Sequence, residues 1–179
     1  IETMIKRTRR HSQSGFTLIE FLIVVLIICV IATVAIPAFM QWIRKTKTNE
    51  AAENVKRIYD GARSYYMQER GIQGGATNAR KFPDNAPMTP TATCCSTSDD
   101  KCQPDPAAWS GAWKDLGFVM DQPHYYQYEF TVSGATFTAL AYGDLDCDGV
   151  ISTFAMSGSA AADGSVPVSA PITKNHELE

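Results

Sequence analysis

Three aspartates at alternate positions between residues 144 and 148 have the spacing of a cation-binding loop. Carboxylates at every second position can converge on one hard cation, and the glycine that follows them permits a sharp turn. A main-chain carbonyl and a serine hydroxyl beyond the glycine can add two more oxygen ligands. The ion expected from this pattern is Ca²⁺, and its expected ligands are Asp144, Asp146, Asp148, Val150 and Ser152.

The loop matches only the first nine positions of an EF-hand. The twelfth position, where an EF-hand has a bidentate glutamate, is Ala155. Residues on both sides have the pattern of strands, so we predict a calcium loop within a β-turn, with a dissociation constant on the order of 10⁻⁴ to 10⁻³ M. The alternative is a solvated, aspartate-rich hairpin turn that needs no ion.

A second chemically informative residue is Glu20, which immediately precedes a long apolar segment. A carboxylate within lipid costs roughly 2.5 to 3.5 kcal/mol, so a glutamate in such a place normally has a partner. A simpler interpretation places Glu20 in the first turn of a helix, where the macrodipole favours a negative charge and the membrane interface keeps it hydrated. The elements around Glu20 decide between these interpretations.

Residues 21–40 are almost entirely apolar, and no charge follows Glu20 until Arg44. About 20 apolar residues form a helix that can cross a bilayer core of roughly 30 Å. The first 15 residues hold four of the 16 basic side chains and one of the 19 acidic ones. The positive-inside rule therefore keeps the N-terminus in the cytoplasm and sends the C-terminal part outward.

The residues after position 15 carry 12 basic and 18 acidic side chains, a net charge of −6. An acidic chain gains nothing from attraction to phosphate backbones, so nucleic acid is not an expected partner. The three histidines are remote from any candidate nucleophile in the sequence. Enzymatic activity is therefore not expected.

From Arg44 to Arg70 the chain is amphipathic, with apolar residues three and four positions apart. We predict one helix over residues 16–70, about 80 Å long at 1.5 Å per residue. Its first part (16–43) is the hydrophobic membrane or assembly helix, and its second part (44–70) is the amphipathic half. Pro37 should kink the helix or melt one turn, because its ring removes a hydrogen bond, and Gly61 is a second weak point. The apolar face comprises Ala51, Ala52, Val55, Ile58, Tyr59, Ala62, Tyr65 and Tyr66.

Residues 71–179 are predicted to form a globular head. Residues 76–123 read as a long loop with a helical turn near 109–116. Strands are expected at 126–132, 136–142 and 150–156, with weaker strand potential at 166–168. The predicted fold class is α+β, with the amphipathic half of the helix packed on an antiparallel sheet of three or four strands.

Four of the five cysteines lie in this head, and export to an oxidising compartment favours two disulfides. A bridge between the adjacent Cys94 and Cys95 would be strained, so each is expected to join Cys102 or Cys147. Both pairings stay open at this point, although a bridge to Cys147 would attach the acidic loop to the long loop. Cys29, in the apolar segment, is interpreted as a small apolar core residue.

The junction Gly15–Phe16, followed by Thr17-Leu18-Ile19-Glu20 and the apolar segment, resembles the type III signal of the type IV filament superfamily. An ordinary secretory signal is cut after its apolar region, whereas here the glycine precedes it, so the apolar helix stays in the mature protein. The resemblance implies that a prepilin peptidase removes residues 1–15 as a leader and methylates the new amine of Phe16. It further implies that Glu20 pairs with the N-terminal amine of a neighbouring copy and that Pro37 lets the helix loosen on assembly.

The same resemblance implies a type IV pilin lollipop and a structural role. The expected product is an extracellular pilus for adhesion or twitching motility, a helical homo-oligomer that grows from a reservoir in the inner membrane. The implied partners are the peptidase, an inner-membrane assembly platform, minor pilins and the membrane. Residues 113–118 and 123–128, with the acidic loop, are similar to pilins of some deltaproteobacteria.

Two alternatives stay open. The nearer is a pseudopilin of type II secretion or a minor pilin, since both share the same N-terminal signal. The other is a monomeric, single-pass, calcium-binding surface protein, which would not be cut at Gly15 and would have no use for a carboxylate at Glu20.

Overall fold

The computed structural model describes residues 15–68 and 80–178. It divides into two compact units, Ile1–Met40 (the first unit) and Gln41–Glu179 (the second unit). The predicted division of the helix into a hydrophobic part (16–43) and an amphipathic part (44–70) stays a prediction. Trp42 and Ile43 line a groove together with Tyr125 of the second unit. The predicted leader, apart from Gly15, and the predicted helix end at 71–75 lie outside the described residues.

One long helix, α1 (Leu18–Met67), contributes to both units. It runs without a break through Pro37, so the melted turn predicted there is not found. A proline removes a single hydrogen bond from the helix ladder, and the bonds of the neighbouring turns remain. Of the first unit the structure describes residues 15–40, in which the large apolar side chains of α1 are exposed.

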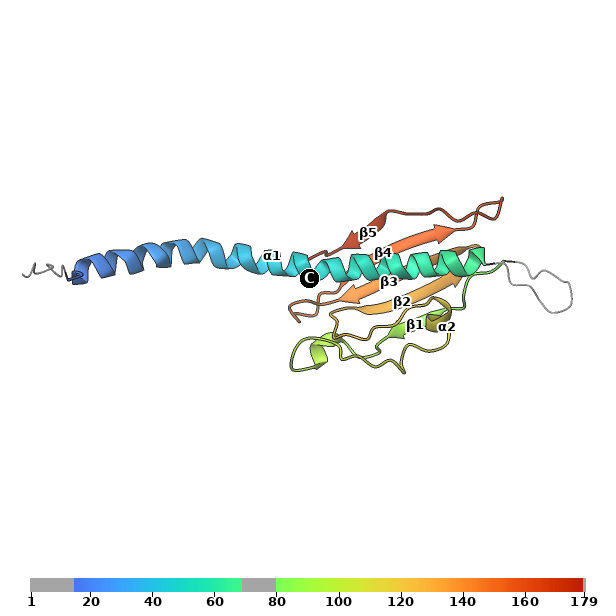
Figure 1. Ribbon diagram of the computed structural model, residues 1–179, viewed down its shortest axis with the longest axis horizontal. Coiled ribbons are helices and arrows are strands. Elements are labelled where there is room, and N and C mark those ends of the chain that lie inside the picture. Colours follow the sequence, from blue (N-terminus) through green and yellow to red (C-terminus); the bar gives the residue numbers. More distant parts are fainter. Residues whose placement is uncertain (1–14, 69–79, 179) are drawn as a thin grey trace, which may run out of the picture. The chain divides into compact units, whose positions relative to one another are not determined.

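The second unit contains a five-stranded antiparallel sheet in the order β1-β2-β3-β4-β5 (Figure 1). The strands are β1 (Ala86–Thr89), β2 (Gln127–Ser133), β3 (Thr136–Gly143), β4 (Ser152–Ser159) and β5 (Ile172–Asn175). The three central strands agree with the predicted ones, and the α+β class is confirmed. A short helix, α2 (Ala112–Asp115), and a 3₁₀ turn, Cys94–Ser96, lie in the predicted long loop.

Two features of the sheet correct the sequence prediction. β1 lies within the stretch expected to be a loop, and the sheet has five strands rather than three or four. Residues 166–168 are not a strand, because side chains of α1 hold them in place: Tyr59 donates to the Pro167 carbonyl at 2.9 Å and Arg63 to the Val166 carbonyl at 3.1 Å. The last strand is instead β5.

The core of the second unit lies between α1 and one face of the sheet, as Figure 1 shows for the second half of α1. Buried α1 residues recur with the predicted three- and four-residue spacing, and Ile58, Tyr59 and Ala62 are fully covered. Gly61 is not a weak point. A Cβ there would lie 2.1 Å from the Leu116 carbonyl oxygen, so glycine lets the chain after α2 pack directly on the helix.

Candidate functional site

The acidic loop between β3 and β4 brings three carboxylates together. Asp144, Asp146 and Asp148 each offer an oxygen, and these oxygens all lie within 4.8 Å of one another. Asp144 Oδ2 accepts a hydrogen bond from the Gly149 amide at 2.9 Å, and Asp148 Oδ1 accepts one from the Val150 amide at 2.8 Å. Both contacts are typical of turns in which an aspartate caps the backbone. The predicted carboxylate cluster is therefore present, and calcium binding stays a prediction.

The loop already has a cationic neighbour, which sequence reasoning did not include. Arg44 of α1 forms an ion pair with Asp146, with 2.7 Å between Nη2 and Oδ2. One oxygen of Asp144 is buried and has no hydrogen-bond partner, so it is available to a cation. Both Arg44 and a bound cation would reduce the mutual repulsion of the three carboxylates.

The two other predicted ligands are placed differently. The main-chain amide of Val150 donates to Asp148, which folds this residue back over the loop. Ser152 is fully buried in β4, and its hydroxyl donates to the Gly143 carbonyl at 2.9 Å. The Ser152 hydroxyl is therefore used to link β3 to β4 and is not in the cluster of the three carboxylates. This corrects the prediction that Ser152 is one of the ligands.

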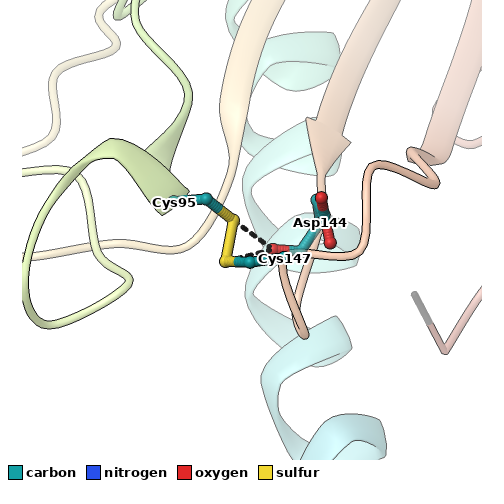
Figure 2. A group of neighbouring side chains, drawn as sticks. All are labelled: Cys95, Asp144 and Cys147. Carbon is teal, nitrogen blue, oxygen red and sulfur yellow. Dashed lines mark hydrogen bonds between the residues drawn. A yellow bond between two sulfur atoms is a disulfide. The ribbon is translucent and has the colours of Figure 1, made fainter.

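Two disulfides hold the adjacent cysteines to different parts of the second unit. Cys94 bonds Cys102, eight residues on, and Cys95 bonds Cys147, 52 residues on. Figure 2 shows the second bridge beside Asp144, whose carbonyl oxygen is 3.2 Å from Cys95 Sγ. Because both of these sulfurs are in a disulfide, they offer no thiolate to a metal, and the bridge instead fixes the middle of the acidic loop.

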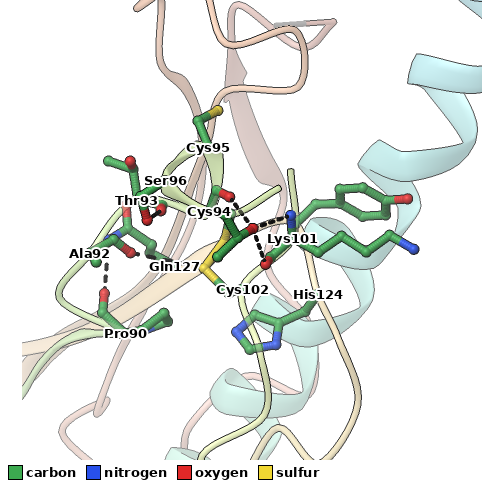
Figure 3. The surroundings of a disulfide bond; sticks show 12 residues. Pro90, Ala92, Thr93, Cys94, Cys95, Ser96, Lys101, Cys102, His124 and Gln127 are labelled. Atoms are coloured by element: carbon green, nitrogen blue, oxygen red, sulfur yellow. Dashed lines mark hydrogen bonds between the residues drawn. A yellow bond between two sulfur atoms is a disulfide. The ribbon is translucent and has the colours of Figure 1, made fainter. Parts of the chain in front are cut away.

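The shorter bridge lies in a closely bonded part of the long loop (Figure 3). Cys102 exchanges two main-chain hydrogen bonds with His124, at 2.8 and 3.1 Å. The Gln127 side-chain amide donates to the carbonyls of Pro90 and Ala92, at 2.8 and 3.1 Å. These bonds attach residues 90–102 of the long loop to residues 124–127, where β2 begins. They hold this part of the loop in place although it has few apolar residues.

The amino-terminal junction is exposed and precedes the helix. Gly15, Phe16 and Thr17 are non-helical, and Phe16 is 73% exposed. The side chain of Glu20 accepts the Thr17 amide at 2.9 Å and the Thr17 hydroxyl at 2.6 Å, while the Glu20 amide donates to that hydroxyl oxygen at 3.3 Å. This reciprocal pairing is a capping box, which stabilises the first turn of a helix.

The apolar part of α1 is long enough to cross a membrane by length and composition, and none of its most apolar stretch is buried. Its side chains from Leu18 to Met40 are exposed apart from the half-buried Ala32, and the exposed ones include Cys29, whose thiol is not in a disulfide. The core role expected for Cys29 is therefore not found within a single copy. An apolar surface this continuous requires a lipid or protein environment that one copy does not provide.

Comparison with known proteins shows what this segment is similar to. Residues 10–36 match the prokaryotic N-terminal methylation motif. The chain is 42% identical over 55 residues to the type IV major pilin protein PilA of Myxococcus xanthus (strain DK1622), covering 31% of this chain and 25% of that protein. The amino-terminal segment is thus similar to that of a type IV pilin.

Two other pilin relatives agree with this. A fimbrial protein of Pseudomonas aeruginosa is 36% identical over 66 residues, or 37% of this chain and 43% of that protein. The fimbrial protein EcpC of Eikenella corrodens is 38% identical over 63 residues, or 35% and 40%. The matches thus span between a quarter and less than half of each relative. No solved structure matches the chain.

Sequence reasoning missed a half-buried carboxylate in this pilin-like chain. Glu50 of α1 accepts the Tyr125 amide at 3.0 Å and the Tyr128 hydroxyl at 3.1 Å, and Asn54 donates to that hydroxyl at 2.8 Å. Burial raises the pKa of the Glu50 carboxyl, and these hydrogen bonds oppose the rise. The signal was present in the sequence, because Glu50 and Asn54 lie eight and four residues before Ile58, respectively, on the same helix face.

A buried histidine in the second unit also has a shifted pKa. His124 is 1% exposed, with Nδ1 2.9 Å from the Gln122 carbonyl oxygen and Nε2 without a partner. Burial lowers the pKa of His124, which keeps the ring neutral. Its surroundings are the rings of Trp109 and Tyr128, so its place is in the core rather than in a reaction centre.

Proposed function

We propose that this chain is the structural subunit of an extracellular type IV pilus, used for adhesion or twitching motility. The observation that carries the proposal is the exposed apolar half of α1, which is preceded by Gly15–Phe16 and has a carboxylate at Glu20. The bilayer would cover this surface in the precursor, and the same segments of neighbouring copies would cover it in the filament. Prepilin peptidase and an inner-membrane assembly platform are the partners that this route requires.

Glu20 has two possible roles, which can be separated experimentally. In a single copy its carboxylate completes a capping box with Thr17. After cleavage, the amine of Phe16 in a neighbouring copy would supply the charge partner that a carboxylate in an apolar environment needs. The first role requires only hydrogen-bonding oxygen, whereas the second requires a negative charge.

The test therefore compares Glu20→Gln with Thr17→Ala. Glutamine serves at this position of a capping box, so Glu20→Gln keeps the cap and removes the charge. Thr17→Ala removes the cap and keeps the charge. We expect Glu20→Gln to abolish filaments and Thr17→Ala to keep them, as measured by the amount of mature chain in the sheared surface fraction and by mass spectrometry of its N-terminus.

The other outcomes point to the alternatives. A mature chain that begins at methylated Phe16 but stays in the membrane fraction of the unmodified strain would indicate a type II secretion pseudopilin or a minor pilin. A chain that is never cut after Gly15 would indicate a single-pass surface protein and would contradict the proposal. If filaments persist with Glu20→Gln, the charge of Glu20 is not needed for assembly, and its role is only to cap the helix.

A further inference from the structure

A groove in the second unit lies beside α1, directly after the apolar segment of that helix. Its volume is about 350 Å³, near the lower end of the range of small-molecule sites. The groove is formed by α1 and by the chain just before β2, and all of its residues belong to the second unit. Its lining consists of Trp42, Ile43, Thr46, Lys47, Glu50 and Tyr125.

The place of the groove along α1 puts it at the surface of a bilayer. The apolar residues 18–40 extend about 35 Å at 1.5 Å per residue, enough for a hydrocarbon core of roughly 30 Å. Trp42 follows closely and is 63% exposed. Tryptophan and tyrosine are enriched at the level of the lipid headgroups. When the apolar segment spans a bilayer, the α1 side of the groove therefore lies among the headgroups.

Two lysines lie over the same aromatic ring at this groove. Lys47 Nζ is 4.5 Å and Lys101 Nζ is 5.2 Å from the centroid of the Tyr125 ring. The two nitrogens are thus at most about 10 Å apart, which is one Debye length at 0.1 M salt, so their charges repel each other. Within residues 15–68 and 80–178, neither lysine is in an ion pair. An anion bound between them would relieve the repulsion.

The positive charge after the apolar segment calls for a partner at this level. Arg44, Lys45 and Lys47 follow the segment on the side that the orientation of the chain sends outward. Positive charge there opposes the orientation that the basic first 15 residues favour. Arg44 has a partner in Asp146, whereas the partner of Lys47 is the neutral ring of Tyr125. A headgroup phosphate would supply the missing negative charge.

The groove also contains a carboxylate, which limits the kind of headgroup. Glu50 accepts the Tyr125 amide with both oxygens, at 3.0 and 3.2 Å, and Oε1 also accepts the Tyr128 hydroxyl at 3.1 Å. A carboxylate has about four acceptor positions, so Oε2 can accept a further donor. Glu50 would repel a headgroup that is only anionic, but it would attract a primary ammonium group.

We propose that the groove binds the headgroup of a zwitterionic aminophospholipid, of the phosphatidylethanolamine type, while the chain is in the membrane. Lys47 and Lys101 bind the phosphate, and Glu50 accepts a hydrogen bond from the ammonium group. The bound lipid attaches the groove to the membrane surface and is released when the chain leaves the bilayer. This inference rests on the proposed function, because it requires the membrane-embedded precursor.

The test measures lipid retention by the full chain. The chain is placed in nanodiscs with equal amounts of phosphatidylethanolamine, phosphatidylcholine and phosphatidylglycerol, and retained lipids are counted by native mass spectrometry. We expect the native chain to retain phosphatidylethanolamine above the other two. Lys47→Gln combined with Lys101→Gln should lower this retention about tenfold, because two charge-assisted contacts to the phosphate are lost.

A matched pair of substitutions controls for charge. Lys56→Gln combined with Lys114→Gln removes the same charge from exposed positions outside the groove and should retain phosphatidylethanolamine as the native chain does. Equal thermal midpoints of the two double variants would show that neither has lost its fold. Retention by the groove variant at the native level, or an equal loss in the control pair, would overturn the inference.

Glu50→Gln tests selectivity for the ammonium group. The amide keeps an acceptor oxygen and removes the negative charge, so the ratio of retained phosphatidylethanolamine to anionic phosphatidylglycerol should fall about tenfold. An unchanged ratio would overturn the assignment of a zwitterionic headgroup. Phosphatidylcholine is the second control, since its quaternary ammonium has no N–H to donate to Glu50.

The lipid measurement does not depend on filaments, so its failure can be told apart from failure of the proposed function. Lysine-dependent retention by a chain that never reaches the sheared surface fraction would contradict the pilus and support the headgroup site. Filaments formed by a chain without lysine-dependent retention would support the pilus and overturn this inference.

Discussion

The two units of this chain place similar side chains of one helix in opposite environments. Ile28 in the first unit is 59% exposed, whereas Ile58 in the second unit is fully buried. Both residues belong to α1 and to the same hydrogen-bonded ladder. The difference shows that apolar character alone does not define a core. A residue is buried only where polar neighbours restrict the apolar surface to one side and another element packs against that side.

The second unit has a buried core and two disulfides that stabilise it, whereas the described part of the first unit has neither. In the second unit the buried face of α1 packs in one core with seven large side chains from the sheet, the loops and α2. These are Trp113, Tyr126, Tyr128, Phe130, Phe137, Phe154 and Met156. Two disulfides hold the surrounding loops in place. The first unit has apolar residues around the whole helix. Such a surface needs a lipid or protein environment that keeps it out of water.

The same substitution in the two halves of α1 gives the sharpest test of this comparison. Ile58→Ala removes a fully buried side chain and should lower the free energy of unfolding of the second unit by about 2 to 5 kcal/mol. Ile28→Ala should leave that free energy unchanged, because Ile28 does not belong to the hydrophobic core of the second unit. Denaturant unfolding of the full chain in detergent, followed by tryptophan fluorescence, measures both. Equal effects would show that the two units do not fold independently.

The long disulfide should have the next largest effect. Replacing Cys95 and Cys147 together by serine opens a loop closed by a bond between residues 52 apart. A bridge over such a distance typically contributes about 2 to 4 kcal/mol, largely by restricting the unfolded chain. We expect a loss of that size in the thermal unfolding of the second unit, together with greater protease sensitivity of residues 144–151.

The shorter bridge provides the matched comparison. Cys94 and Cys102 are only eight residues apart, so their replacement should cost less through loop entropy than replacement of Cys95 and Cys147. A larger effect from the shorter bridge would mean that its buried packing beside His124, rather than chain entropy, provides the stabilisation.

Much of this architecture is encoded locally and could be predicted. The helix follows from apolar periodicity, the central strands from alternation, and the cleavage junction from a short motif. β1 and β5 escaped prediction because each has only four residues and one neighbouring strand, so neither shows a full alternation. β1 also contains Pro87, which is tolerated on an edge strand but argues against a strand in the sequence.

Long-range features of the candidate site could not be predicted, because they depend on the packing of distant segments. Cys94 and Cys95 are equivalent in sequence, and only their position at the 3₁₀ turn decides which of them reaches Cys147. The contacts of Arg44 with Asp146 and of Glu50 with Tyr128 join the helix to residues far along the chain. Ser152 matched a ligand position in the motif, but the alternation of β4 turns it inward.

Two titratable groups, the buried His124 and the half-buried Glu50, should make the stability of the second unit depend on pH. The folded pKa of His124 lies below its usual value of 6.5, so the unfolded state binds more protons and stability falls as pH drops through 6.5. The folded pKa of Glu50 lies above its usual 4.5, so the folded state binds more protons and stability falls as pH rises from 4.5 through the raised value.

Glu50→Gln isolates the second contribution. The amide keeps an oxygen acceptor for Tyr125 and Tyr128 but does not titrate, so the decrease of stability above pH 4.5 should disappear in the variant. The decrease at acid pH from His124 should remain. Thermal midpoints measured from pH 4 to 8 provide the comparison, and an unchanged profile would show that Glu50 stays ionised at little cost.

Calcium should have the smallest effect, and it tests whether the acidic loop is a site or a turn. If the three carboxylates bind the ion, millimolar Ca²⁺ should raise the thermal midpoint of the second unit, and Asp144→Asn should remove this response. Arg44→Gln should strengthen the response, because it removes the cation that already neutralises Asp146. Mg²⁺ is the control, since it demands a tighter octahedral site. No shift with Ca²⁺ in either the native chain or Arg44→Gln would mean that the ion pair and the turn alone account for the loop.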